Sequence, residues 1–311
     1  MNRKEFLKKT AAIGAVVGLS SLFDGVGYKL SADENILNDN TDIPDLVAVR
    51  NGEPDVMFDA GIKAIGGIER FVKKGQTVLV KPNIGWNVSP EGAANTNPGL
   101  VKRIIESCLN AGAKKVYVFD HTCDNPAGCY KNSGIENVVK NAGGEMVDGS
   151  AFKYYHEFEI PTAKVNKKNR VHELVLDTDV FINVPILKSH SGSGSTIAMK
   201  NLMGVVWDRG VYHSTDLHRS IAEFCLYKKP TLNIVDAYVV MTKYGPRGIS
   251  SGDGLKLVKN LLISTDIVAV DSAASLILNK EPSKTNYIKI ADELKIGVMD
   301  LNKVKIKKIS V

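Results

Sequence analysis

Residues 180–187, VFINVPIL, form a run in which every side chain except Asn183 is apolar. A strand with one solvated face alternates apolar and polar residues, whereas a strand of a parallel sheet covered by helices on both faces is apolar throughout. Segments with helical periodicity separate this run from similar ones at residues 46–49, 77–80, 116–119, 232–235 and 261–264. The sequence therefore predicts an α/β fold with an open, mostly parallel sheet and helices on both faces.

The beginning of the chain differs in character from the rest. Residues 1–30 join a basic start to an apolar stretch at residues 11–23, which is shorter than the roughly 20 residues of a membrane span but typical of a signal peptide. Arg3-Lys4 before Phe6-Leu7-Lys8 is similar to a twin-arginine signal in which lysine replaces the second arginine. We expect export to the periplasm or cell surface by this route or the Sec route, with an uncleaved membrane anchor as the alternative.

The remaining chain predicts one domain. Residues 31–44 are rich in Asn and Asp and predict a linker, and residues 45–311 predict a single α/β domain with a small irregular insertion at about 145–175. No membrane span beyond the leader is expected. The net charge of +6 is diffuse, and the densest basic clusters lack the interleaved aromatic residues of a nucleic-acid interface. Nucleic acid is therefore not an expected partner.

The chain has four cysteines and no CxxC motif. Cys108 and Cys225 belong to apolar helical patterns and predict small core residues. Cys123 and Cys129 bracket a short loop, and in an exported protein this arrangement is compatible with a disulfide. Two cysteines are too few for an iron–sulfur cluster, so this chain alone is not expected to bind one.

Polar side chains follow five of the predicted strands at their carboxyl ends. Ligands of open α/β sheets bind beyond the carboxyl ends of parallel strands, so these side chains predict one shared site. The alternative is that each is an ordinary solvated strand end. The residues concerned are Lys81 with Asn83, Asp120 with His121, Lys188 with His190, Asp236, and Asp266.

A Gly/Ser loop at residues 191–196 leads into a helical pattern. Glycine allows a ligand to approach the backbone, and a helix start offers unpaired N–H groups, so the loop predicts an anion seat at the helix start. The loop matches neither the Walker motif nor the dinucleotide fingerprint, and a plain strand–turn–helix connection is the alternative. The residues expected to bind the anion here are Ser193, Ser195, Thr196, Lys200 and Asn201.

The residue types at the predicted site favour a small anionic ligand, phosphate or carboxylate. Lys81, Lys188 and Lys200 would hold the anion, together with Asn83 and with Arg247 as a mobile clamp. The expected catalytic residues are His190 for proton transfer, and Asp120 and Asp236 as bases or as partners that orient the lysines. Asp266 and Asp271 are candidate ligands of a divalent metal. No G-x-S-x-G elbow is present, which disfavours a serine hydrolase.

Five sequence blocks carry these residues and, in this order, resemble the family known as domain of unknown function 362. They are VLVKPNIGWN, VYVFDHTCDN, FINVPILKSHSGSGSTIAMKNLMGVV, LNIVDA and STDIVAVDSAASLIL. The resemblance covers residues 47–294 and implies no assigned reaction. It implies an exported protein and, because many relatives carry a ferredoxin-like cysteine cluster, a link to iron–sulfur redox chemistry, although this chain lacks that cluster. Three functions are therefore expected as alternatives: an enzyme acting on a small anion, with or without a metal; a redox accessory that docks with an iron–sulfur partner protein; and a non-catalytic exported binding protein.

Overall fold

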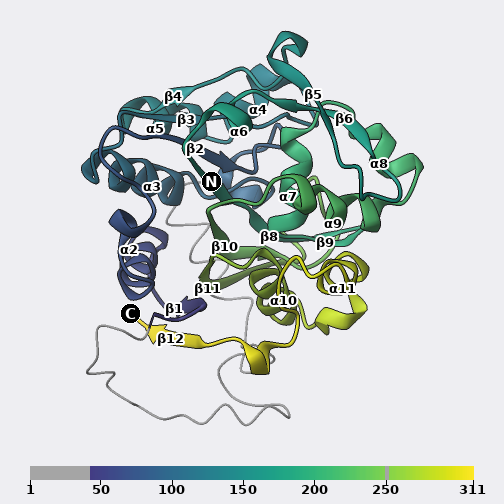
Figure 1. The fold of residues 1–311 in the computed structure, drawn as a ribbon. Helices are drawn as coiled ribbons and strands as arrows, with labels where there is room; N and C mark the ends of the chain where they lie inside the picture. The colour runs from purple at the N-terminus through teal and green to yellow at the C-terminus, as the bar shows by residue number, and fades with distance from the viewer. Residues whose placement is uncertain (1–42, 249–251) are drawn as a thin grey trace.

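The computed structural model describes residues 43–248 and 252–311. The predicted export signal and nearly all of the predicted linker lie outside these ranges. Within them, no helix has the length and apolar character that a membrane crossing requires. The described chain is built around a ten-stranded sheet (Figure 1).

The sheet has the strand order β12-β1-β11-β10-β7-β2-β3-β4, and β8 pairs with β10 and β9 beside this path. β10, β7, β2, β3 and β4 run parallel, whereas β11 is antiparallel to both of its neighbours. The predicted fold class, a mostly parallel sheet with helices, is confirmed. The bounds are β1 Leu46–Arg50, β2 Thr77–Pro82, β3 Lys115–Val118, β4 Glu145–Met146, β7 Val180–Val184, β8 Ile186–His190, β9 Gly194–Thr196, β10 Leu232–Met241, β11 Leu255–Ser264 and β12 Ile306–Ser310.

Helices cover both faces of the sheet (Figure 1). Successive side chains of a strand point to opposite faces, so Leu46 and Ala48 enter one core while Val47 and Val49 enter the other. On the Val47 face lie α2 (Pro54–Ala64), α3 (Pro98–Asn110), α4 (Pro126–Asn132) and α5 (Ile135–Asn141). On the Leu46 face lie α7 (Ala198–Asn201), α9 (Leu217–Tyr227), α10 (Ile267–Ile277) and α11 (Asn286–Glu293).

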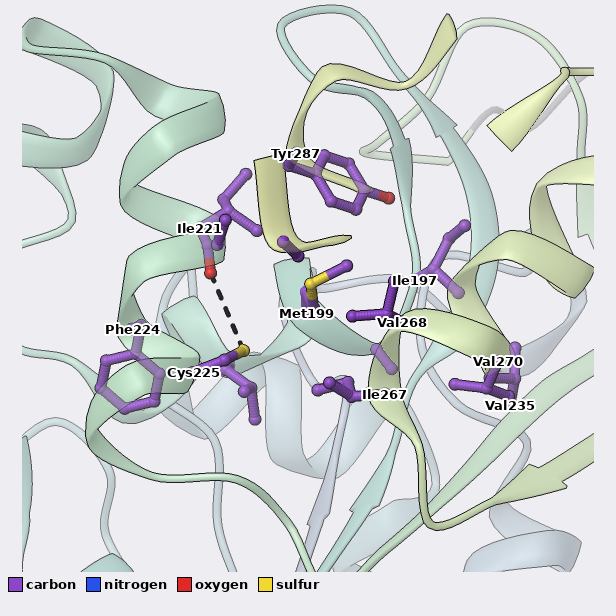
Figure 2. Close-up of a cluster of buried hydrophobic side chains, with 14 of the residues drawn as sticks. Ile197, Met199, Ile221, Phe224, Cys225, Val235, Ile267, Val268, Val270 and Tyr287 are labelled. Carbon is purple, nitrogen blue, oxygen red and sulfur yellow. Dashed lines mark hydrogen bonds between the residues drawn. The ribbon is translucent and has the colours of Figure 1, made fainter. Parts of the chain in front are cut away.

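The core on the Leu46 face shows why these helices form where they do. Figure 2 shows Met199 of α7, Phe224 of α9, Val268 of α10 and Tyr287 of α11 converging on the sheet. Apolar residues of α9 recur at helical spacing and are buried along one side of that helix. Cys225 is one of them, as predicted, and its thiol donates to the Ile221 carbonyl 4.0 Å away.

Two local predictions need correction. The run at residues 180–187 is two strands, because Pro185 separates β7 from β8. The Gly/Ser loop is a hairpin between β8 and β9, in which Lys188 pairs with Thr196 across the two strands.

The segment predicted as an irregular insertion contains a small sheet of its own. β5 (Tyr155–Glu159) and β6 (Lys168–His172) pair antiparallel, apart from the main sheet. The short helices α6 (Leu174–Asp177) and α8 (Gly210–Ser214) lie on the same side of the molecule as this ribbon (Figure 1).

Candidate functional site

A pocket of about 410 Å³ lies where β2, β3 and β8 end. The parallel strands bring residues together that are up to 120 positions apart in the sequence. The structure does not test the chemical roles expected of them, but it places most of them in one wall. The predicted site residues that line the pocket are Lys81, Asn83, Asp120, His121, Lys188, His190, Thr196, Lys200 and Asn201.

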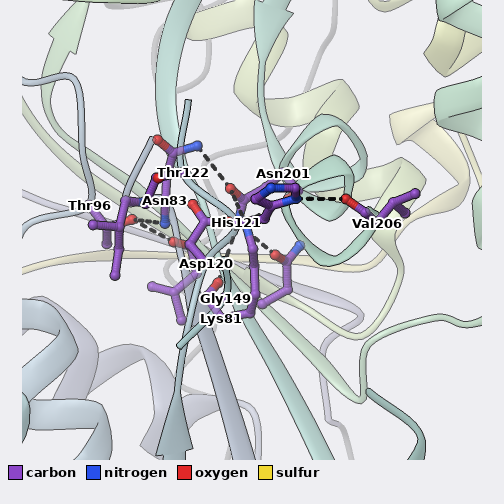
Figure 3. Close-up of polar contacts among 12 residues, drawn as sticks. Lys81, Asn83, Thr96, Asp120, His121, Thr122, Gly149, Asn201 and Val206 are labelled. Atoms are coloured by element: carbon purple, nitrogen blue, oxygen red, sulfur yellow. Dashed lines mark hydrogen bonds and ion pairs between the residues drawn. The ribbon is translucent and has the colours of Figure 1, made fainter. Parts of the chain in front are cut away.

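A buried ion pair forms the floor of the pocket (Figure 3). Lys81 Nζ lies 2.8 Å from Asp120 Oδ1, and both side chains are at most 3% exposed. Asp120 Oδ2 accepts the N–H of Ile84 at 2.7 Å, and Lys81 also donates to the backbone and side-chain oxygens of Asn201 at 2.7 and 3.0 Å. Burial lowers the pKa of Lys81, and Asp120 opposes this effect. The pair is thus held in place by protein groups on both sides, through Ile84 and Asn201.

Gly204 lines the pocket and lies directly against this ion pair. A Cβ at position 204 would lie 1.9 Å from Asp120 Oδ1 and 2.5 Å from Lys81 Nζ. Both distances are far below van der Waals contact, so only glycine allows the chain to pass here without moving the pair. The buried ion pair therefore leaves room for no residue but glycine at position 204.

Lys188 projects into the pocket from β8 with almost no exposure to solvent. Its ammonium donates to Asn83 Oδ1 at 3.2 Å and to the Ala94 carbonyl. Neither acceptor carries a charge, so burial dominates and lowers the pKa of Lys188 to about 7, with Lys200 and Lys81 adding to the decrease.

Lys200 has a still poorer set of partners. Its residue is 8% exposed, and among the described residues its ammonium contacts only the Met203 thioether, at 3.2 Å. A thioether sulfur is a weak acceptor. Burial lowers the pKa of Lys200 to about 8. Lys188 and Lys200 thus give the pocket two positive charges that no carboxylate of the described chain pairs with.

His190 lines the pocket, and two hydrogen bonds fix the orientation of its ring. Its Nδ1 accepts the backbone N–H groups of Gly192 and Ser193 at 3.0 and 3.3 Å, which fixes the proton on Nε2. Burial, and then Lys200 and Lys188, lower its pKa to about 3. The neutral ring keeps its Nε2–H as a hydrogen-bond donor, and its expected role in proton transfer stays a prediction.

The predicted anion seat at the start of α7 is already filled. Asp271 of α10 accepts the N–H groups of Ala198 and Met199 at 2.7 and 3.1 Å. Ser193 and Ser195 do not line the pocket, because their hydroxyls bond the Ser195 carbonyl and the Tyr287 hydroxyl. The positive side chains, rather than the helix start, are what the pocket offers an anion.

Replacing Asp271 with asparagine is expected to destabilise the protein by about 1–3 kcal/mol, because the amide NH₂ would face one of two buried N–H groups. Urea unfolding measures the loss. Asp177→Asn, at an exposed position at the end of α6, is the control and should change stability little. Equal stability of the two variants would contradict this role of Asp271.

Three further predicted residues lie outside the pocket. Asp236 is buried within β10, where its carboxylate accepts the N–H groups of Asn97 and Tyr238 at 2.7 and 3.0 Å, and burial raises its pKa to about 6. Arg247 stacks over the Trp86 ring at 4.8 Å, at the rim. Asp266 follows β11, which runs antiparallel to β10, so it lies at the opposite edge of the sheet.

The two candidate metal ligands are occupied by backbone groups. Asp266 caps α10 through Val268 and Ala269 and also accepts the N–H of Val298. Asp271 holds the start of α7, as described above. Within residues 43–248 and 252–311, no three His, Cys, Asp or Glu side chains gather in a way that would hold a metal ion.

The cysteines are all free, so the disulfide between Cys123 and Cys129 is not formed. Cys129 is buried in α4 with its thiol directed at the Gly85 carbonyl, 3.8 Å away. Cys123 is exposed and lines the pocket. Cys123 also contacts the Gly85 carbonyl, through its backbone N–H at 2.8 Å, but its side chain is exposed whereas that of Cys129 is buried.

Arg209 is a pocket residue that the sequence analysis did not single out. Its guanidinium donates to the carbonyls of His121 and Thr122 at 2.7 and 2.6 Å, and Nη1 lies 3.3 Å from the Cys123 sulfur. Its sequence neighbourhood, WDRG, carries no motif that would have revealed it. His121 is fixed nearby by Val206 and Trp207.

Proteins similar to this chain include one relative with a related sequence and two with solved structures. Thylakoid-associated protein sll1697 of Synechocystis sp. is 27% identical over 230 residues, which are 71% of this chain and 69% of that protein. The lactate racemase apoprotein of Thermoanaerobacterium thermosaccharolyticum matches 80% of this chain with 12% identity and a TM-score of 0.44. A Thermotoga maritima protein matches 73% with 11% identity and a TM-score of 0.47. The match spans only 57% and 59% of those two chains.

The match to a family model carries more weight than the two structural matches, whose sequence identities and TM-scores are low. The sequence model of the family described as "Domain of unknown function (DUF362)" matches residues 78–275, well over half of the chain. The matched range holds every pocket residue discussed above. The chain belongs to the DUF362 family.

Proposed function

We propose that this protein is an enzyme that acts on a small anionic molecule, a carboxylate or a phosphate, seated on Lys188 and Lys200. The observation that carries the proposal is the pair of buried ammonium groups that face one pocket without a carboxylate partner among the described residues. Buried charges in proteins are normally paired. A bound anion would supply the missing charge.

The electrostatic argument favours an anion over a cation or a neutral ligand. At an effective dielectric constant of 20, a unit negative charge about 4 Å from one ammonium gains about 4 kcal/mol. Asp120 is already paired with Lys81 and accepts the Ile84 N–H, so it offsets the charge of Lys188 only in part. A cation would instead meet Lys81, Lys188, Lys200 and Arg209 in the same space.

Burial lowers the pKa of both lysines into the range in which a lysine can exchange a proton near neutral pH, to about 7 for Lys188 and about 8 for Lys200. We assign the acceptance of a substrate proton to Lys188, which Asn83 and Ala94 hold in place, and the binding of the anion to Lys200. His190, protonated at Nε2, would donate a hydrogen bond to the same ligand.

Binding of sulfate or malonate is expected to weaken as pH rises. The anion needs protonated lysines, and the free pocket loses these protons above the pKa values of about 7 and about 8. Between about pH 6.5 and about pH 9, affinity by titration calorimetry should fall by about tenfold or more. Sulfate is suitable because its own charge is constant over this range.

Variants of the two lysines test whether the anion binds at this site. Lys200→Met and Lys188→Met should each weaken sulfate and malonate binding at about pH 6.5 by tenfold or more, while Lys140→Met, at an exposed position of α5, should bind as the wild type does. Circular dichroism checks that each variant is folded. The proposal fails if the wild type binds neither anion, or if the Lys188→Met/Lys200→Met double variant binds them unchanged.

A further inference from the structure

Cys123 is the one pocket-lining residue with a nucleophilic thiol among the residues described. Cys108, Cys129 and Cys225 are buried elsewhere, whereas Cys123 is open to solvent at the pocket. Its sulfur lies 3.3 Å from Arg209 Nη1, whose guanidinium is itself held by two backbone carbonyls. The cysteine therefore faces the pocket beside a fixed positive charge.

The sulfur is also close to the group that anchors Lys188. A Cβ on Gly85 would lie 3.9 Å from the Cys123 sulfur and 3.4 Å from Asn83 Oδ1. Asn83 Oδ1 in turn accepts the hydrogen bond of the Lys188 ammonium at 3.2 Å. Gly85, which has no side chain, thus lies between the thiol and the amide that anchors Lys188.

Lys200 gives an independent indication that a ligand occupies this space. Its ammonium is buried, lines the same pocket and contacts only a thioether among the described residues. A negative charge placed on Cys123 would raise the pKa of both Lys188 and Lys200, against the effect of their burial. The thiol and the two lysines thus face the same part of the pocket.

We propose that Cys123 is the nucleophile of the pocket and that its substrates are small anions that carry an electrophilic carbon. Lys188 and Lys200 hold the anionic group, and the thiolate attacks the carbon. The sulfur–carbon bond forms as the bond from that carbon to the leaving group breaks, and the leaving group departs with the electron pair. The thiol proton passes to solvent or to the free amine of Lys188. This inference rests on the proposed function, since it uses the same anion seat.

Two alkylating reagents of nearly equal size test the inference. Iodoacetate is an anion and iodoacetamide is neutral, and each forms a thioether with release of iodide. Because both react with the same sulfur, the ratio of their rates cancels the ionised fraction of the thiol and reports how strongly the pocket, including Arg209, attracts an anion; the lysine variants then isolate the share of Lys188 and Lys200. Peptide mapping by mass spectrometry gives the rate at Cys123, and N-acetylcysteine amide, an uncharged thiol, gives the reference ratio.

We expect the iodoacetate-to-iodoacetamide ratio at Cys123 to exceed the reference by about tenfold or more at about pH 7. Lys200→Met should reduce the ratio towards the reference while the iodoacetamide rate is kept. Sulfate should slow iodoacetate, Cys123→Ser should abolish labelling at this position, and Gly85→Ala should slow iodoacetate by narrowing the space beside the sulfur.

The outcomes separate this inference from the proposed function. A wild-type ratio equal to the reference, in a protein that binds sulfate, overturns the role of Cys123 and leaves the anion site intact. A protein that neither binds sulfate nor shows a raised ratio overturns both. A raised ratio that persists in the folded Lys188→Met/Lys200→Met variant also overturns the inference, because the lysines would then not direct the reagent.

Discussion

Gly204→Ala is expected to lower the free energy of unfolding by about 3–5 kcal/mol, the range found when a buried ion pair is broken. The added methyl group would lie 1.9 Å from Asp120 Oδ1 and 2.5 Å from Lys81 Nζ. Neither group can retreat freely. Asp120 is tied to Ile84 and Lys81 to Asn201, and both are almost fully buried. The two charges would be pushed apart inside the protein while their other hydrogen bonds hold each of them in place.

The same chain offers a matched control in Gly85→Ala. Gly85 also lines the pocket, but its added Cβ would meet the nearest atoms at 3.4 and 3.9 Å, which are ordinary contact distances. Urea unfolding of both variants measures the difference, and the slope of the transition shows whether unfolding remains two-state. Similar midpoints for the two alanine variants would mean that the ion pair is not held as tightly as the structure indicates.

Lys200→Met is expected to stabilise the protein by about 3 kcal/mol near pH 7, although it weakens anion binding. The lysine has a pKa of about 8 in the folded protein, against an ordinary value of 10.5. Protonated Lys200 therefore costs the folded state free energy, and methionine fills a similar volume without charge. This is a case in which a binding residue is kept at the expense of stability.

The gain in stability of Lys200→Met should decrease as the pH rises. Below about pH 8 both the folded and the unfolded lysine are protonated, so the wild type bears the full cost and the variant gains most. Between about pH 8 and about pH 10.5 the folded lysine is neutral while the unfolded one still binds a proton, so the gain shrinks and then disappears.

Urea unfolding of the wild type and of Lys200→Met at about pH 7 and about pH 10 measures this trend. Lys140→Met is the control and should differ little from the wild type at either pH. A gain that is the same at both values would show that packing, rather than the buried charge, causes it. The absence of any gain near pH 7 would show that Lys200 finds a partner in solution.

The convergence of Lys81, Asp120 and Lys188 could be predicted from the sequence because it needs only one assumption. If buried apolar runs are parallel strands, the residues after them meet at one edge of the sheet. The polarity of residues that lie just past such runs is visible in the sequence. The chemical roles assigned to them remain predictions.

The failures have a common cause, which is that sequence patterns do not show direction or distant partners. An apolar run reads the same in a parallel and an antiparallel strand, so β11 could not be recognised as reversed, and Asp266 was placed at the wrong edge. The start of α7 seemed free to bind an anion, because nothing local shows that Asp271 reaches it from 72 or 73 residues away. Arg209 was missed for the same reason, since its partners lie more than 80 residues earlier in the chain.

Two of the edge strands of the sheet, β4 and β12, limit how molecules of this protein can meet. β4 has only two residues, and β12 carries Lys307 and Lys308 beside each other. A strand edge with free backbone groups invites a neighbouring molecule to add a strand, and very short strands and lysines are the usual protection against it. We therefore expect these two edges of the sheet to resist the addition of a strand from another molecule. A protein with a long apolar edge strand would aggregate at concentrations at which this one does not.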